Sequence, residues 1–141
     1  MTTAIICTAI LAAMLFALGI NVSRMRGVAG KTGGSQFPND PASGLFKAIR
    51  AHGNAAEYVP VLIVLFLLVG ARSPAAVAIP LMAGATGARL VHAYGLLSSP
   101  SLAAPTTSRL IGAAGTYLFG IGLAVPAVLS LCGPAARRWR R

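Results

Sequence analysis

The sequence predicts an all-α integral membrane protein, built as one domain of four transmembrane helices over residues 1–141. Hydrophobic residues make up 56% of the chain and charged residues only 10%, whereas a soluble domain carries about 25% charged residues. Four apolar runs follow one another, each long enough to cross a hydrocarbon core of about 30 Å at about 1.5 Å per residue. Lipid must therefore form part of the solvent of this protein.

The first helix is expected over about residues 2–23, because no charged residue precedes Arg24. A cleaved signal peptide is the alternative, but it would carry basic residues before its apolar core, and here they follow it. Residues 24–39 are expected to form a loop, since they contain several glycines and a proline.

The second helix is expected over about 41–69, because Asp40 is a good N-cap and Pro41 suits the first helical position. Serine- and proline-containing breaks then separate a third helix, over about 75–97, from a fourth over about 106–131. Alanine and glycine are dense in the last two helices, which favours close helix packing in lipid.

The net charge of +10 does not indicate nucleic acid, because the basic residues lie at the ends of apolar runs without interleaved aromatic residues. Their placement favours contact with lipid headgroups and binding of anions, and the basic tail around Trp139 is typical of an interfacial anchor. Cys7 and Cys132 are interpreted as small apolar residues. No metal site is expected, because the histidines and cysteines lack ligand spacing.

Four spans place both termini on one side of the membrane and the two longer loops on the other, here called the loop face. Most polar residues of the helices fall near the helix ends that meet at the loop face. They are Arg24, Arg26, Lys47, Arg50, His52, Asn54, Glu57, Tyr58, Arg89, His92, Tyr94 and Arg109.

Arg50, Asn54 and Glu57 have the spacing i, i+4, i+7, which predicts one polar stripe along the second helix. A structural ion pair of Glu57 with Arg89 or Arg24 is one interpretation of the buried charges. It leaves several further basic residues unexplained. A surplus of guanidinium groups at one place favours an anionic ligand, with the glutamate available to a ligand ammonium group.

The run from Arg50 to Pro60 resembles the signature of the MAPEG family, the membrane-associated proteins in eicosanoid and glutathione metabolism. The shared pattern is arginine, asparagine four residues on, glutamate three further on, and then tyrosine, at the start of the second of four helices. The layout matches over essentially the whole chain, and Arg89 resembles an arginine of the family's third helix. Short loops and a high alanine content indicate a bacterial member.

The resemblance implies a homotrimer in a bacterial inner membrane, with glutathione bound between subunits at a site facing the cytoplasm. It implies a glutathione transferase or peroxidase of the microsomal type, which uses glutathione as co-substrate against lipophilic electrophiles or hydroperoxides. The glutathione-binding residues would be Arg24, Arg50, His52, Asn54, Glu57, Tyr58, Arg89 and His92.

The chain departs from the family pattern at two places. His92 stands where better-known members have tyrosine, and residues 96–107 lack the arginine that binds the glutathione thiolate in eicosanoid-forming members. Arg109 or Arg26 is the nearest substitute, and either is a candidate catalytic residue. For His52, a position at headgroup level is the alternative interpretation.

Two other functions are consistent with the sequence. One is a catalytically silent binding or scaffold protein on the same fold. The other is a small multidrug-type transporter, which such sequences resemble in size and in having a membrane glutamate. Those transporters place the glutamate in the first helix, whereas the first helix here has no charged residue before Arg24.

Overall fold

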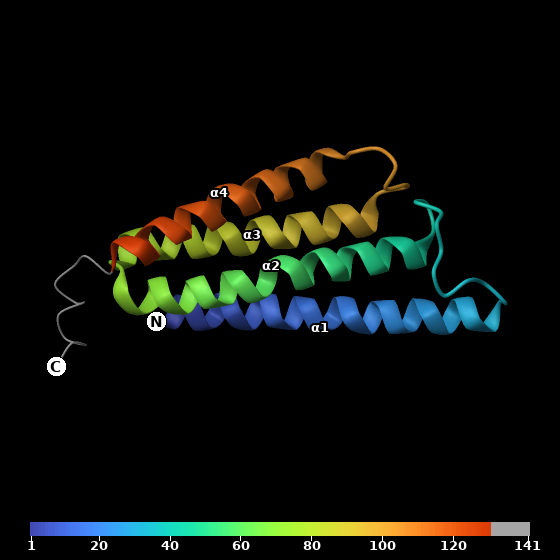
Figure 1. Cartoon of the computed structure of the whole chain (residues 1–141), viewed down its shortest axis with the longest axis horizontal. Coiled ribbons are helices and arrows are strands. Elements are labelled where there is room, and N and C mark those ends of the chain that lie inside the picture. The colour runs from blue at the N-terminus through green and yellow to red at the C-terminus, as the bar shows by residue number, and fades with distance from the viewer. Residues whose placement is uncertain (131–141) are drawn as a thin grey trace.

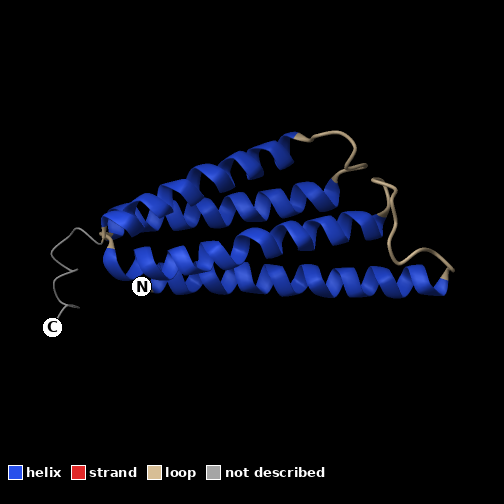
Figure 2. Cartoon of the chain, in the orientation of Figure 1, coloured by secondary structure: helices blue, strands red, loops and turns tan. Residues whose placement is uncertain are grey.

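A computed structural model describes residues 1–130 of the chain. They form α1 (Thr2–Lys31), α2 (Gly44–Arg72), α3 (Ala75–Ser98) and α4 (Thr107–Leu129) (Figure 1). Between these helices the described residues form only loops and turns, as Figure 2 shows. All four helices are long and apolar enough to cross a membrane. The predicted all-α bundle of four spans is confirmed.

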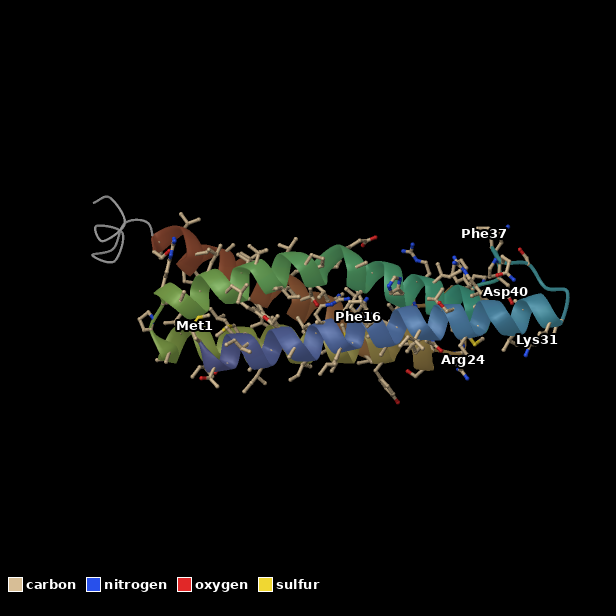
Figure 3. The ribbon with its side chains drawn as sticks, turned by 90° about the horizontal axis from the view of Figure 1, so that it is seen from below. Met1, Phe16, Arg24, Lys31, Phe37 and Asp40 are labelled. Carbon is tan, nitrogen blue, oxygen red and sulfur yellow. The ribbon has the colours of Figure 1, made fainter. Side chains whose placement is uncertain are left out.

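The helices lie side by side along one long axis (Figure 1). The α1–α2 loop and the α3–α4 loop lie at one end of the bundle, and the N-terminus and the short α2–α3 turn lie at the other. In Figure 3, Arg24 and Lys31 lie at the same end as Asp40, whereas Met1 lies at the opposite end. The two loops therefore share one face, as the connectivity predicted.

Large apolar side chains from each helix form the core, among them Leu11, Phe66, Met82 and Leu123, each at most 2% exposed. Many other large apolar side chains point outward, such as Phe16 at 73% exposed. In water such a surface would be costly, and in a bilayer it is the surface that contacts acyl chains.

Helices α3 and α4 make the most extensive contact of any pair, because small residues line their interface. A Cβ atom added at Gly112 would lie 2.5 Å from the backbone nitrogen of His92, and one at Gly95 would lie 2.9 Å from the backbone nitrogen of Arg109. Only glycine permits this approach. The packing places His92 and Arg109 side by side on neighbouring helices.

Helix α1 is longer than predicted, since it runs to Lys31 rather than ending near residue 23. The glycines of this segment do not end the helix, which continues to Lys31. Thr32 follows as the C-cap, and its Oγ1 donates to the carbonyls of Val28 and Ala29 at 3.2 and 3.1 Å. Basic residues in the last turns also suit the negative end of a helix dipole. The expected loop is accordingly shorter and begins at Thr32.

Helix α2 begins later than predicted, at Gly44 with Ser43 as N-cap. The carboxylate of Asp40 accepts a hydrogen bond from the backbone N–H of Ala42 at 2.9 Å, two residues on, so it closes a local turn instead of capping the helix. The predicted position of Pro41 in the first helical turn is therefore wrong. Helix α3 ends within one residue of its expected bound.

Helix α4 ends at Leu129, and its expected end near residue 131 lies outside the described residues. The predictions for Cys132 and for the basic tail around Trp139 also fall outside them.

Candidate functional site

A cavity of about 380 Å³ opens at the loop face between α2, α3 and α4. Its polar lining consists of Arg50 and Asn54 from α2, His92 from α3 and Arg109 from α4, and its apolar lining consists of Pro41, Phe46, Leu96 and Leu102. The volume lies within the range of small-molecule sites, about 300–1,000 Å³. The structure therefore brings together residues that the sequence placed at one face, from three helices and both loops.

The two loops are tied together over this cavity. The backbone N–H of Leu102 donates to the carbonyl of Pro41 at 2.9 Å, and the ammonium group of Lys47 donates to the carbonyl of Ser99 at 3.1 Å. Lys47, one of the polar residues predicted at the loop face, thus joins α2 to the α3–α4 loop. These bonds hold the cavity wall in place from both sides.

Arg109 is anchored at the edge of the cavity by the α3–α4 loop. Its Nη1 donates to the carbonyl of Ala104 at 2.7 Å and to that of Leu102 at 3.4 Å. Both bonds use the same nitrogen, so Nη2 and Nε can serve a ligand, since a guanidinium group has five N–H donors. The arrangement positions one face of a fixed cation towards the cavity.

Arg89 lies deeper and is the largest fully buried side chain, at 1% exposed. Its Nη2 donates to Oδ1 of Asn54 at 2.8 Å, and its guanidinium carbon lies 5.2 Å from the centre of the Tyr58 ring. Its Nε has no hydrogen-bond partner within the described residues. A buried cation with only a neutral partner is costly in a membrane, which favours an anionic ligand nearby.

A second, much smaller cavity of about 20 Å³ lies beside Arg89. It is lined by residues of α2, α3 and α4, namely Asn54, Tyr58, Arg89, His92, Ala113, Thr116 and Tyr117. Asn54 and His92 line both cavities. The volume is enough for about one water molecule or one ligand atom group.

Glu57 is not paired with either expected base in this chain. Arg89 bonds to Asn54, and Arg24 donates to the side chain of Asn21 at 3.3 Å. Glu57 itself lies exposed on the outer side of α2. The ion-pair interpretation of the buried charges is therefore wrong within a single chain.

Three further residues expected at the site do not line the cavity of their own chain. Arg24 and Arg26 lie exposed near the end of α1, where the guanidinium carbon of Arg26 lies 5.8 Å from the centre of the Phe37 ring. The ring of His52 contacts α1, where a Cβ at Gly19 would lie 3.3 Å from its Nε2.

Tyr117 is a polar residue near the site that was not predicted from the sequence. The hydroxyl of Tyr58 donates to that of Tyr117 at 3.3 Å, and the two ring centres lie 5.9 Å apart. Tyr117 follows Arg109 by eight residues, about two helical turns, and this spacing puts both on similar sides of α4. That spacing was the signal available in the sequence.

The tyrosine pair lies at one end of an apolar groove of about 350 Å³ between α2 and α4. The groove continues along Val61, Leu62, Leu65, Gly120, Ile121 and Ala124. The small cavity beside Arg89 and this apolar groove share Tyr58, Thr116 and Tyr117, so these residues form the boundary between them.

Within residues 1–130, no group of three or more histidine, cysteine, aspartate or glutamate side chains is placed to hold a metal ion.

Comparison with known proteins identifies the family. The family model described as MAPEG family matches residues 4–129, which include all four helices. No curated protein and no solved structure matches the chain significantly. The family includes glutathione transferases and related proteins, and its members bind glutathione and form membrane-associated oligomers. With four apolar spans and a match along nearly its whole length, the chain belongs to the MAPEG family.

Proposed function

We propose that this protein binds glutathione in the cavity at the loop face and transfers it to lipophilic electrophiles or uses it to reduce lipophilic hydroperoxides. The observation that carries the proposal is the cavity lined by Arg50, Asn54, His92 and Arg109, to which residues 1–130 contribute two arginines and no acidic side chain. Membership of a family that includes glutathione transferases supports the same function.

The charges of the site suit those of glutathione, which has two carboxylates, one ammonium group and one thiol. Arg50 is exposed at the cavity and can form a bidentate pair with a carboxylate. Arg89 adds a buried positive charge beside the small cavity, where it donates to Asn54 and contacts the ring of Tyr58. A monoanionic tripeptide would offset part of this positive charge.

A homotrimer would supply the residues that a single chain leaves outside the cavity. Glu57, Arg24 and Arg26 are exposed in the isolated chain, although each is an ionisable group on or next to a membrane span. At a subunit boundary, Glu57 would bind the ligand ammonium group, and the α1 arginines would reach a neighbouring cavity. The known formation of membrane oligomers in the family supports this arrangement.

Arg109 is the residue we assign to the glutathione thiolate, in preference to Arg26, because Arg109 lines the cavity and has donors free for a ligand. A free thiol has a pKa near 8.5, and lowering it by about two units requires roughly 2.7 kcal/mol of preferential thiolate stabilisation. A fixed guanidinium group in a site of low dielectric constant can supply much of that.

The apolar groove along α2 and α4 would hold the lipophilic second substrate, which enters from the bilayer. Its polar end, at Tyr58 and Tyr117, would place the reactive carbon or peroxide near the thiolate. Glutathione is a cytoplasmic reductant, so the loop face would face the cytoplasm of a bacterial inner membrane.

The test is the thiolate absorbance of bound glutathione on purified protein in detergent. With the thiol pKa lowered by two units, most bound glutathione would be thiolate at pH 7, and Arg109→Gln would reduce this to a few per cent, on the order of the free thiol. Arg72→Gln is the matched control, because Arg72 lies exposed at the opposite end of α2 and should leave the signal unchanged.

Three results would contradict the proposal. Saturable binding without a thiolate signal would indicate a catalytically silent binding protein. An equal loss of signal in both arginine variants would show that Arg109 has no special role. Failure to bind glutathione, with proton-coupled cation flux that Glu57→Gln abolishes, would indicate a transporter.

A further inference from the structure

We propose that His92 is the general base of the site, and that its Nε2 accepts the proton of the glutathione thiol. This inference rests on the proposed function, because it requires glutathione in the cavity. It assigns a proton-accepting catalytic residue to a site whose charged side chains, the arginines, can only donate hydrogen bonds.

The tautomer of His92 follows from its hydrogen bond. Nδ1 lies 3.0 Å from the backbone carbonyl oxygen of Arg109. A carbonyl oxygen has no proton to donate, so Nδ1 must carry the hydrogen. In a neutral imidazole the other nitrogen is then an unprotonated acceptor, and here that nitrogen is Nε2.

The position of this acceptor is fixed by helix packing. Gly112 allows α4 to approach the backbone of His92, where an added Cβ would lie 2.5 Å from the backbone nitrogen. The same close packing brings the Arg109 carbonyl to Nδ1. The ring is held by α4 at one nitrogen and lines both the large and the small cavity.

Among the described residues, the other side chains that line the large cavity are not suited to take a proton. Arg50 and Arg109 are donors only, and Oδ1 of Asn54 already accepts from Arg89. A thiol that becomes a thiolate in this cavity must pass its proton to an acceptor. Among the side chains that line the large cavity, His92 offers the one titratable nitrogen with an open lone pair.

The charged and titratable groups that face His92 come from all three surrounding helices. They are Arg50 and Tyr58 from α2, Arg89 from its own helix, and Arg109 and Tyr117 from α4. The arginines favour the thiolate once it has formed, because nearby positive charges stabilise an anion.

The step balances without a redox partner. The S–H bond of glutathione breaks and an N–H bond forms at Nε2, while the electron pair of the S–H bond stays on sulfur. The thiolate is then paired with Arg109, and the imidazolium loses its proton to solvent. No oxidant or reductant takes part.

The test is stopped-flow measurement of thiolate formation after glutathione is mixed with the full-length protein, purified in detergent in its own oligomeric state. The chosen variant is His92→Asn, because the asparagine amide can still donate to the Arg109 carbonyl but offers no basic nitrogen. We expect thiolate formation to slow by about a hundredfold, the usual contribution of a general base. Added imidazole should restore part of the rate in this variant and leave the wild type unchanged.

Two controls separate a base from a structural residue. S-methylglutathione has no thiol proton, so its affinity should be the same for wild type and His92→Asn. Arg72→Gln changes a side chain exposed in the last turn of α2, at the end of the bundle opposite the cavity, and it should leave the rate of thiolate formation unchanged.

The outcomes are distinct. Wild-type rates in His92→Asn with glutathione bound would overturn this inference and leave the proposed function standing. Loss of S-methylglutathione binding in His92→Asn would also overturn it, since the role would then be structural. Absence of glutathione binding by the wild type would overturn the proposed function and this inference with it.

Discussion

The burial of Arg89 leads to a prediction about stability whose magnitude is unusually small for so deeply buried a side chain. Replacement by methionine removes a guanidinium group that is 1% exposed. It removes a charge whose cost inside a membrane is about 2.5–3.5 kcal/mol. It also removes the bond to Asn54, worth about 1.5–3 kcal/mol for a charged donor, and the contact with the Tyr58 ring.

These contributions nearly offset each other, and methionine fills much of the vacated volume. We therefore expect Arg89→Met to change the free energy of unfolding of the ligand-free protein by no more than about 1 kcal/mol. Asn54→Ala should lower the free energy of unfolding by about 2 kcal/mol, because it leaves the buried guanidinium group without its hydrogen-bond acceptor.

The double variant isolates the interaction. In the Arg89→Met background, Asn54→Ala should cost little, so the cycle should give a coupling of about 2 kcal/mol. Glutathione at a hundred times its Kd should stabilise the wild type by about 2.7 kcal/mol, and Arg89→Met should lose most of that gain.

The assay is unfolding in mixed micelles, followed by circular dichroism with and without glutathione. Destabilisation of ligand-free protein by more than about 3 kcal/mol in Arg89→Met would show that the arginine is a structural residue. Unchanged stabilisation by glutathione in that variant would show that its charge does not serve the ligand.

Two further predictions concern the packing and the groove. Gly112→Leu should separate α3 from α4, because its Cβ would meet the backbone of His92, and the free energy of unfolding should fall by about 1–3 kcal/mol. Gly87→Ala, with open space around the added Cβ, should be neutral or slightly stabilising. Equal effects of the two variants would refute the packing argument. Gly120→Val should narrow the groove, where an added Cβ meets only Leu62 at 4.0 Å. Steady-state kinetics should then show a several-fold higher KM for a lipophilic electrophile with an unchanged KM for glutathione, and a rise in both would count against the groove.

Much of the fold followed from the sequence, because a bilayer leaves few options to an apolar run of this length. Hydropathy predicted four spans, and their number alone placed both loops on one face. Helix ends were harder, because they depend on local competition between hydrogen bonds. Thr32 caps α1 beyond its glycines, and Asp40 closes a turn where it was expected to cap α2.

The sequence predicted which end of the bundle carries the candidate site, but not which side chains bond to each other there. Periodicity and connectivity brought Arg50, Asn54, His92 and Arg109 to one end. They did not reveal that Arg89 would bond to Asn54 rather than to Glu57. That choice depends on the rotation of each helix about its axis, which side-chain packing decides.

The most direct test of the central claim is the equilibrium affinity of the purified protein for glutathione, measured by titration calorimetry in detergent. We predict saturable binding that Arg50→Ala weakens by about tenfold or more, since a charge-assisted bond to a carboxylate is worth roughly 1.5–3 kcal/mol. An absence of saturable binding, or the same affinity in wild type and Arg50→Ala, would contradict a glutathione site at the loop face.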